Sequence, residues 1–238
     1  MYDDYRNKEG VFMKEMDPRY KDQWISVDAA TFTIIDGVIK VLLVRRNEEP
    51  YKGLLSLPGG AVYNDESTED AILRELNEKI GLDKIILKQF AVFSDPKRDI
   101  RYRNISVCYL ALIDSKKHKF LLSPKKVSEM IWTNLTDVPK LAFDHNEILD
   151  VSIESLKEAL TKSDIVKNIM ADTFTIQELQ NVYEIIFKCK FDERNFRRKF
   201  VNLGLIYQTG EKKETDRYRR PNLYKFYDNL PIDQINFL

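Results

Sequence analysis

The chain has 238 residues, enough for one large domain or two smaller ones with ample hydrophobic core. Its 38 basic and 38 acidic residues cancel, which excludes a polycation that binds nucleic acid over its whole surface. No apolar run approaches the roughly 18 residues of a membrane helix, and the first residues do not form a signal peptide. Cys108 and Cys189 lack metal-ligand spacing and predict two inert core thiols in a reducing compartment. We therefore expect a cytoplasmic protein.

The first half of the chain predicts a mixed sheet flanked by helices. Residues 1–22 are polar and aperiodic, which indicates an N-terminal arm. Two runs rich in β-branched residues, 25–35 and 38–45, meet at Asp36-Gly37, a strong hairpin signal. Further strands are expected over 85–93, 105–113 and 128–134.

A helix is expected over 68–80, between the first and later strands. Ser67 and Asp70 form a capping box for its first free amides, and Gly81 ends it. One apolar stripe follows the helical repeat, made of Leu73, Leu76 and Ile80.

Two carboxylates, Glu75 and Glu78, share another face of this helix. The turn before it contains Gly59 and Gly60, whose backbone can approach a ligand closely. Hard oxygen ligands on a rigid helix suit Mg²⁺, which keeps several waters and reaches out to substrate phosphates. The alternative is a charged surface helix, which would not require these residue types at so many set spacings between 60 and 82. The pattern favours a site for a phosphorylated ligand.

The stretch 60–82 resembles the Nudix box, in which a Gly, a Glu six residues later and an Arg-Glu-x-x-Glu-Glu core precede a closing Gly. The matching residues are Gly60, Glu66, Arg74, Glu75, Leu76, Glu78, Gly81 and Leu82. The resemblance implies catalytic roles for Arg74, Glu75 and Glu78, and metal binding by Glu66, Glu75 and Glu78. Lys79 departs from it, because the family has a metal-ligand Glu there. An ion pair between Lys79 and Glu75 would compete for the remaining ligand, which weakens Mg²⁺ binding but not binding of a diphosphate.

Three arginines crowd the loop 94–103: Arg98, Arg101 and Arg103. Their guanidinium groups suit phosphate or carboxylate oxygens. Spacing alone favours a solvated charged turn, whereas the position next to the expected diphosphate site favours ligand binding. With Gly59, Gly60 and His145 they form the expected ligand-binding set. His145 precedes a helix expected over 146–161, and a single His there could simply cap that helix or fill a pocket.

The pattern changes near 163–174, where we expect a second domain to begin. Thr175 and Glu178 form a capping box for one helix, and Asp192 begins a second helix that Gly204 stops. In this second helix, Phe196, Phe200 and Leu203 are expected to face inward. Two short strands, expected over 205–209 and 222–227, enclose a charged loop. Helix, turn, basic helix and hairpin is the order of a winged helix-turn-helix.

The second helix of this region predicts contacts with DNA. Between Lys188 and Lys225, twelve basic residues stand against five acidic ones. Asn and Arg suit base edges, and Arg and Lys suit phosphates. The expected DNA-binding residues are Arg194, Asn195, Arg197, Arg198, Lys199, Asn202, Arg219 and Arg220. The alternative is a helical subdomain that only dimerises or covers the active site.

The combination resembles the NrtR-like, Nudix-related transcriptional regulators over nearly everything after residue 22. Besides the Nudix box, the resemblance rests on residues 95–99, 141–145, 174–179, 194–198 and 219–224. Arg219 departs from it, because the family usually has Gly there. The resemblance implies an α+β protein with an arm (1–22), a Nudix domain (23–162; a mixed sheet between helices) and a winged helix-turn-helix domain (163–238). It also implies a homodimer that binds operator DNA upstream of NAD-metabolism genes and senses ADP-ribose, a related nucleotide or a pentose.

Two functions remain open. The first is a ligand-responsive repressor, which Lys79 favours because a sensor benefits from binding without turnover. The second is a Mg²⁺-dependent pyrophosphohydrolase acting on ADP-ribose, which the matching Glu66, Arg74, Glu75 and Glu78 favour. One chain can do both. A purely structural interaction protein leaves both the box and the basic region unexplained.

Overall fold

The computed structural model describes residues 23–123, 126–162, 165–214 and 220–228, together with two short paired strands, β1 (Tyr5–Arg6) and β2 (Phe12–Met13). The rest of the expected arm, and Arg219, lie outside the described residues. In the described ranges every helix is too short or too polar to cross a bilayer.

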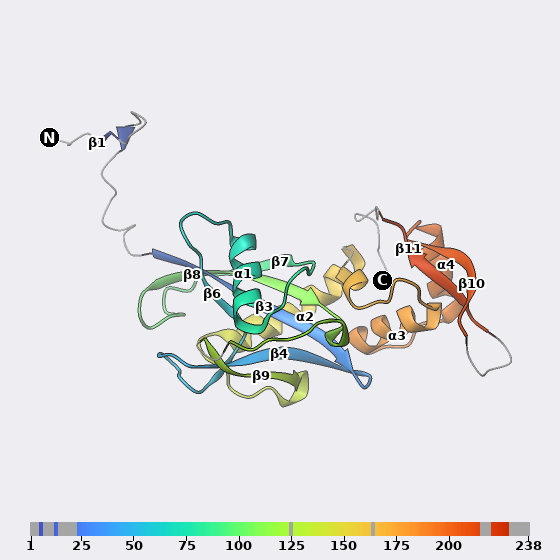
Figure 1. Cartoon of the computed structure of the whole chain (residues 1–238), viewed down its shortest axis with the longest axis horizontal. Coiled ribbons are helices and arrows are strands. Elements are labelled where there is room, and N and C mark those ends of the chain that lie inside the picture. Colours follow the sequence, from blue (N-terminus) through green and yellow to red (C-terminus); the bar gives the residue numbers. More distant parts are fainter. Residues whose placement is uncertain are drawn as a thin grey trace.

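A seven-stranded mixed sheet forms the centre of the first part of the chain (Figure 1). Its strands are β3 (Gln23–Ile35), β4 (Val38–Arg46), β5 (Leu55–Ser56), β6 (Gly59–Ala61), β7 (Lys88–Phe93), β8 (Arg103–Leu112) and β9 (Val127–Asn134). β3 pairs with β8 in parallel, and the other pairs are antiparallel. β3 turns into β4 through Asp36 (φ 51°) and Gly37 (φ 74°), as expected of an Asp-Gly hairpin.

Both faces of the sheet are covered by helices. On β3, Val27 and Ala29 belong to the core under α1 (Thr68–Ile80), whereas Ala30 and Phe32 belong to the core on the side of α2 (His145–Lys162). Successive strand residues point to opposite faces, so this central strand is apolar almost throughout. β7 begins only at Lys88, later than predicted, and the preceding Ile85 and Leu87 pack against the α1-side core.

The capping box of α1 is confirmed. Ser67 Oγ accepts a hydrogen bond from the Asp70 amide at 3.1 Å, and Gly81 (φ 69°) ends the helix. The predicted apolar stripe was partly wrong: Ile72 is fully buried with Leu76 and Ile80, while Leu73 is only half-buried. Ile72, Leu76 and Ile80 recur every four residues and therefore share one face of the helix, whereas Leu73 lies about 100° around the helix from Ile72, at the edge of that face.

The last part of the chain is a winged helix. α3 (Ile176–Phe187) and α4 (Glu193–Asn202) precede an antiparallel hairpin of β10 (Ile206–Lys212) and β11 (Asn222–Phe226). The rings of Phe196 and Phe200 meet Tyr183 edge-on, with centroids 5.5 and 5.4 Å away, and form the centre of this unit. Cys189 lies exposed just after α3, so the prediction of two buried thiols holds only for Cys108.

The two parts share one hydrophobic core. The cluster on the α2 side of the sheet continues from Phe32 through Leu156 and Leu160 to Tyr183 and Phe200. The buried Tyr183 hydroxyl donates to the carbonyl oxygen of Leu160 at 2.9 Å, which joins the last turns of α2 to α3. Figure 1 accordingly shows α2 reaching from the sheet toward α3 at the winged-helix end.

Candidate ligand pocket and nucleic-acid interface

A pocket of about 290 Å³ opens where α1 and β6 meet the strands β3, β4 and β8. Its lining includes Asp28, Arg46, Gly59, Gly60, Glu75, Lys79, Arg98, Arg101, Lys126, Phe143 and His145. Five of these side chains are cationic Arg or Lys, so the pocket suits an anionic ligand.

Gly59 and Gly60 are required by packing. β6 crosses β3 so that Gly60 faces Val27, and a Cβ on Gly60 would lie 2.3 Å from the carboxyl carbon of Glu75. A Cβ on Gly59 would lie 2.1 Å from the carbonyl oxygen of Val27. Both contacts are shorter than real side chains tolerate, so the two glycines let the carboxylate of α1 lie directly under the strand.

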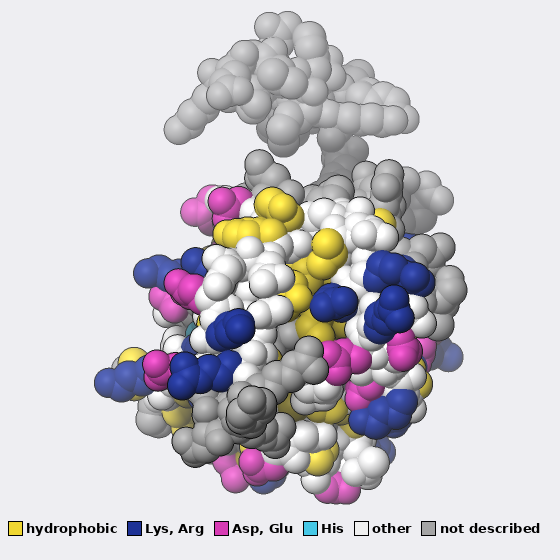
Figure 2. Space-filling model, turned by 90° about the vertical axis from the view of Figure 1, so that its right-hand side faces the viewer, with side chains coloured by type: hydrophobic (Ala, Val, Ile, Leu, Met, Phe, Trp, Pro, Cys, Tyr) yellow, Lys and Arg dark blue, Asp and Glu magenta, His cyan; other side chains and the backbone are white. Residues whose placement is uncertain are grey.

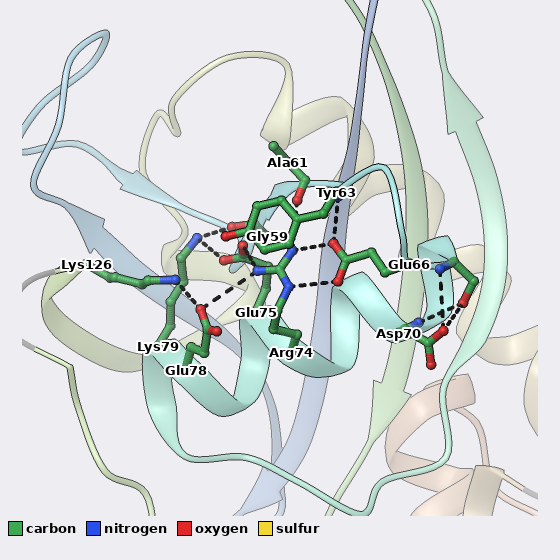
Figure 3. Close-up of polar contacts among 11 residues, drawn as sticks. Gly59, Ala61, Tyr63, Glu66, Asp70, Arg74, Glu75, Glu78, Lys79 and Lys126 are labelled. Atoms are coloured by element: carbon green, nitrogen blue, oxygen red, sulfur yellow. Dashed lines mark hydrogen bonds and ion pairs between the residues drawn. The ribbon is translucent and has the colours of Figure 1, made fainter. Parts of the chain in front are cut away.

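Arg74 gathers the carboxylates of the Nudix box around itself (Figure 3). Its guanidinium donates to both oxygens of Glu66 at 2.8 and 2.6 Å, and to Glu75 at 2.5 Å. Glu78 lies 3.8 Å away on the same side. The hydrogen bonds from Arg74 lower the pKa of Glu66 to about 2, so this carboxylate stays ionised and bound.

Two lysines bind the remaining oxygens. Lys79 makes the predicted ion pair with Glu75 at 3.0 Å and also donates to the carbonyl oxygen of Gly59. Lys126 donates to Glu78 (Figure 3). The hydrogen bond to Glu78 raises the pKa of Lys126, which keeps its ammonium charged.

Nudix domains generally use divalent metal ions. Here Glu66, Glu75 and Glu78 are each bonded to a cationic side chain of the protein. Across the described ranges, no group of three or more His, Cys, Asp or Glu side chains is placed to hold a metal ion. The residues present therefore do not fit a metal in this arrangement.

The floor of the pocket is a buried ion-pair network. Arg98 donates to both oxygens of Asp144 at 2.8 Å and lies 3.7 Å from Asp28, with only 3% of its side chain exposed. Burial opposes the charge of Arg98, but its hydrogen bonds to the Asp144 carboxylate leave its pKa above the ordinary value. Arg98 is thus committed to internal carboxylates and holds the floor together.

His145 begins α2 and is buried in the same floor. Its Nδ1 accepts from the Leu57 amide at 2.9 Å, so the proton of the neutral ring lies on Nε2, 3.6 Å from Asp28 Oδ1. Burial lowers the pKa of His145, which keeps the ring neutral. His145 is therefore a neutral, buried ring whose Nε2 faces Asp28 at a distance longer than a hydrogen bond.

The rim carries arginines and aromatic rings. Arg101 pairs with Asp99 at 2.8 Å and lies over the rings of Tyr102 and Phe143, 4.7 and 5.6 Å from their centroids. Trp24 stacks on Tyr102 with centroids 4.5 Å apart. Planar rings beside guanidinium groups suit a flat, anionic ligand such as a nucleotide.

Phe143 and Tyr51 adopt left-handed backbone conformations at this rim, with φ of 54° and 66°. Their rings meet edge-on at 4.9 Å, and the guanidinium of Arg46 lies 4.8 Å from the Phe143 centroid. Of the two rings, that of Phe143 lines the pocket, and that of Tyr51 packs against it.

The predicted arginine cluster is divided by the fold. Arg98 is in the floor and Arg101 on the rim, whereas Arg103, at the start of β8, donates to the carbonyl oxygen of Ser94. Sequence reasoning missed Asp28, Arg46 and Lys126 as pocket residues. None of the three residues belongs to a local sequence pattern, so none carried a signal of its own.

α4 presents its polar face to solvent. Phe196 and Phe200 are buried against α3, as predicted. The exposed side chains opposite them are Arg194, Asn195, Arg197, Arg198 and Asn202, and Arg220 is exposed just before β11. Lys199 is half-buried, which lowers its pKa.

Asn195 and Arg198 form one unit on this face. Arg198 donates to Asn195 Oδ1 at 3.0 Å, and the carboxylate of Asp192 caps the helix at the Asn195 amide at 2.8 Å. Figure 2 looks onto this end of the molecule, where several Lys and Arg side chains gather with a few acidic ones among them. The surface suits a polyanion.

Comparison with known proteins agrees with this architecture. Residues 25–152 match the NUDIX domain, and residues 166–226 match the NrtR DNA-binding winged helix domain. The ADPR responsive transcriptional repressor NtrR of Acinetobacter baylyi is 33% identical over 211 residues, which span 87% of this chain and 83% of that protein.

Solved structures of Shewanella oneidensis NrtR are also similar. The form complexed with a 27mer DNA has a TM-score of 0.70 at 32% identity, covering 85% of this chain and 93% of that one. Its NUDIX domain complexed with ADP ribose has a TM-score of 0.55 at 37% identity, covering 60% of this chain and 94% of that one. This chain therefore belongs to the NrtR family, in which a Nudix domain is joined to a winged helix.

Proposed function

We propose that this protein is a transcriptional repressor that binds operator DNA through its winged helix and responds to ADP-ribose bound in its Nudix pocket. The observation that carries the proposal is the solvent-exposed Arg/Asn face of α4, in the same chain as a pocket rich in cations. The repressor and the DNA and ADP-ribose complexes among its relatives support it. In this proposal the Nudix domain spans 23–162 and the winged helix 163–238.

The pocket supports ADP-ribose as the ligand, ahead of other nucleotides or a pentose. Lys79 and Lys126 offer ammonium groups to the diphosphate, beside the two glycines of β6. The rings of Trp24, which is 48% exposed, and Phe143 offer flat faces for the adenine. Gly59, Gly60, Arg101 and His145 of the expected set also line the pocket, and Arg46 is added to it.

Helix α2 connects the two sites. His145 at its first turn lies in the pocket floor, and Leu160 in its last turn accepts the hydrogen bond from Tyr183 of α3. Its 18 residues span about 27 Å. A ligand that draws Asp144 or His145 toward itself would shift α2, and with it the helix pair that presents α4. A homodimer would place two α4 helices about 34 Å apart on a palindromic operator. The ligand-induced shift of α2 would change that spacing and so weaken DNA binding.

The test is DNA binding with and without ligand. The intact protein should bind a labelled palindromic fragment upstream of its own operon, and ADP-ribose should release the fragment. Arg198→Ala should abolish the complex at modest salt. Arg45→Ala is the control: Arg45 is a half-buried arginine of β4 paired with Glu129, away from α4, and its loss should leave the complex unchanged. No binding to any genomic fragment at modest salt would exclude the repressor function.

Hydrolysis of ADP-ribose is a second candidate, because Glu66, Glu75 and Glu78 all surround Arg74. Mg²⁺ is the ion to test first, and displacing Lys79 from Glu75 is the obstacle. Release of AMP from ADP-ribose in Mg²⁺, lost on Glu75→Gln, would establish this activity. No product at high protein concentration would count against it.

A further inference from the structure

We infer that Lys79 and Lys126 act as built-in cations for a diphosphate, so that this Nudix pocket binds its ligand without a divalent metal. The inference rests on the proposed function, since it concerns how the same pocket binds ADP-ribose. It assigns to two ammonium groups the charge neutralisation that a metal ion would otherwise supply.

Charge balance is the first support. The α1 cluster contains three carboxylates, Glu66, Glu75 and Glu78, and three cations, Arg74, Lys79 and Lys126. The six groups cancel, so the empty cluster has no excess negative charge to attract a divalent ion. A metal at Glu75 would also lie within about 3 to 4 Å of the Lys79 ammonium, where the two cations repel each other strongly.

Geometry is the second support. In the described part of the chain, the Lys79 ammonium has two oxygen partners, Gly59 O and Glu75 Oε2, which fix its position at the pocket wall (Figure 3). An ammonium carries three N–H donors, so one remains for a phosphate oxygen lying over Gly59 and Gly60. Both lysines line the pocket, and 17% of the Lys79 side chain and 37% of the Lys126 side chain are exposed.

The two lysines reach the pocket from different elements of the fold. Lys79 is held on the inner wall by backbone and carboxylate, whereas Lys126 comes from the segment before β9 and reaches over Glu78. The diphosphate has two phosphoryl groups, and the two ammonium groups that line the pocket match them in number and charge. Charge-assisted hydrogen bonds of this kind contribute more than neutral ones.

The experiment measures ADP-ribose binding to the full-length protein by calorimetry, in EDTA and again in MgCl₂. The wild-type dissociation constant should agree within about twofold between the two buffers. Lys79→Met should bind about 10- to 100-fold more weakly in EDTA, because a charge-assisted hydrogen bond is lost. Inorganic pyrophosphate in EDTA should compete with ADP-ribose on the wild type and much less on Lys79→Met.

Lys79→Glu sharpens the test, because it leaves the cluster with two excess negative charges. It should bind ADP-ribose poorly in EDTA and recover about 10-fold or more in MgCl₂. Lys162→Glu is the matched control: it breaks an i, i+4 ion pair with Glu158 at the far end of α2 and should behave as the wild type.

The outcomes separate this inference from the proposed function. Wild-type protein that binds ADP-ribose only in MgCl₂ would overturn the inference and leave the repressor function standing. Lys79→Met binding as tightly as the wild type in EDTA would also overturn it. Absence of ADP-ribose binding in both buffers would instead overturn the assignment of the ligand. The wild-type comparison needs no variant, so a variant that fails to fold does not prevent the test.

Discussion

The pocket and the exposed face of α4 use the same residue types in opposite ways. In the pocket Arg98 and Lys79 are bonded to internal carboxylates, and Arg98 is almost fully buried. On α4, Arg194 and Arg197 face solvent. Buried pairs become costly when one partner is removed, whereas exposed charges contribute little to folding. Substitutions in the buried floor of the pocket should therefore test stability, and substitutions on α4 should test DNA affinity.

The largest effect is expected for Arg98→Ala. It leaves Asp28 and Asp144 buried without their cation, which should lower the free energy of unfolding by about 3 to 5 kcal/mol. Urea denaturation followed by circular dichroism measures this loss. Arg194→Ala should change stability by less than about 0.5 kcal/mol. Equal stability of the two variants would contradict the view that buried pocket charges support the fold and exposed α4 charges do not.

Asn195→Ala should weaken operator binding by about 1 to 3 kcal/mol without loss of stability. It removes a side chain suited to base edges and releases Arg198, whose guanidinium it positions. Fluorescence anisotropy on operator and on random DNA measures both affinity and specificity, and random DNA should be affected much less. Asn77→Ala, an exposed position on α1, is the control. A uniform loss on both DNAs would mean that Asn195 does not read bases.

Two substitutions of Asp192 separate the effect on protein stability from the effect on DNA affinity. Asp192→Ala removes the N-cap of α4 and should cost about 1 kcal/mol of stability. Asp192→Asn keeps a cap of similar quality but removes a negative charge near the DNA backbone, so it should bind DNA more tightly at unchanged thermal stability. Thermal melts and a salt titration of DNA binding distinguish the two. Weaker DNA binding by Asp192→Asn would contradict a phosphate-facing α4 terminus.

The smallest expected effect is the loss of the Glu66–Arg74 contribution to stability at acidic pH. Arg74 depresses the pKa of Glu66 from 4.5 to about 2, so the stabilisation by this pair is fully present above pH 4.5 and is lost as pH falls toward 2. Wild type and Glu66→Gln should therefore differ in stability by a constant amount above pH 5 and converge below pH 4. Urea midpoints over this range measure the difference. A difference that grows as pH falls would show that the ion pair is not the cause.

Local patterns predicted local structure well. The capping boxes at Ser67 and Thr175, the Asp-Gly turn and the buried Phe196 and Phe200 all depend on residues within a few positions of one another. The polar face of α4 follows from the same helical repeat. These features were therefore readable before the fold was known.

The floor of the pocket was not readable in this way. Arg98 meets Asp144 and Asp28, which lie 46 and 70 positions away in sequence, and only the β3–β8 pairing and the start of α2 bring them together. The sequence therefore suggested that the arginines of the loop 94–103 bind ligand, whereas in the structure Arg98 and Arg101 pair with the protein's own carboxylates. Arg46 and Lys126 were missed because a lone basic residue at a strand end or in a loop has no pattern of its own.

The left-handed backbone of Tyr51 and Phe143 has a consequence for how the Nudix domain opens. Side chains with a Cβ disfavour this conformation by about 1 to 2 kcal/mol each, and only the surrounding contacts keep it populated. We therefore expect amide protons around Tyr51 and Phe143 to exchange readily with solvent in the empty protein. A base or sugar in contact with the Phe143 ring would stabilise this strained backbone conformation and so slow the exchange of the nearby amide protons.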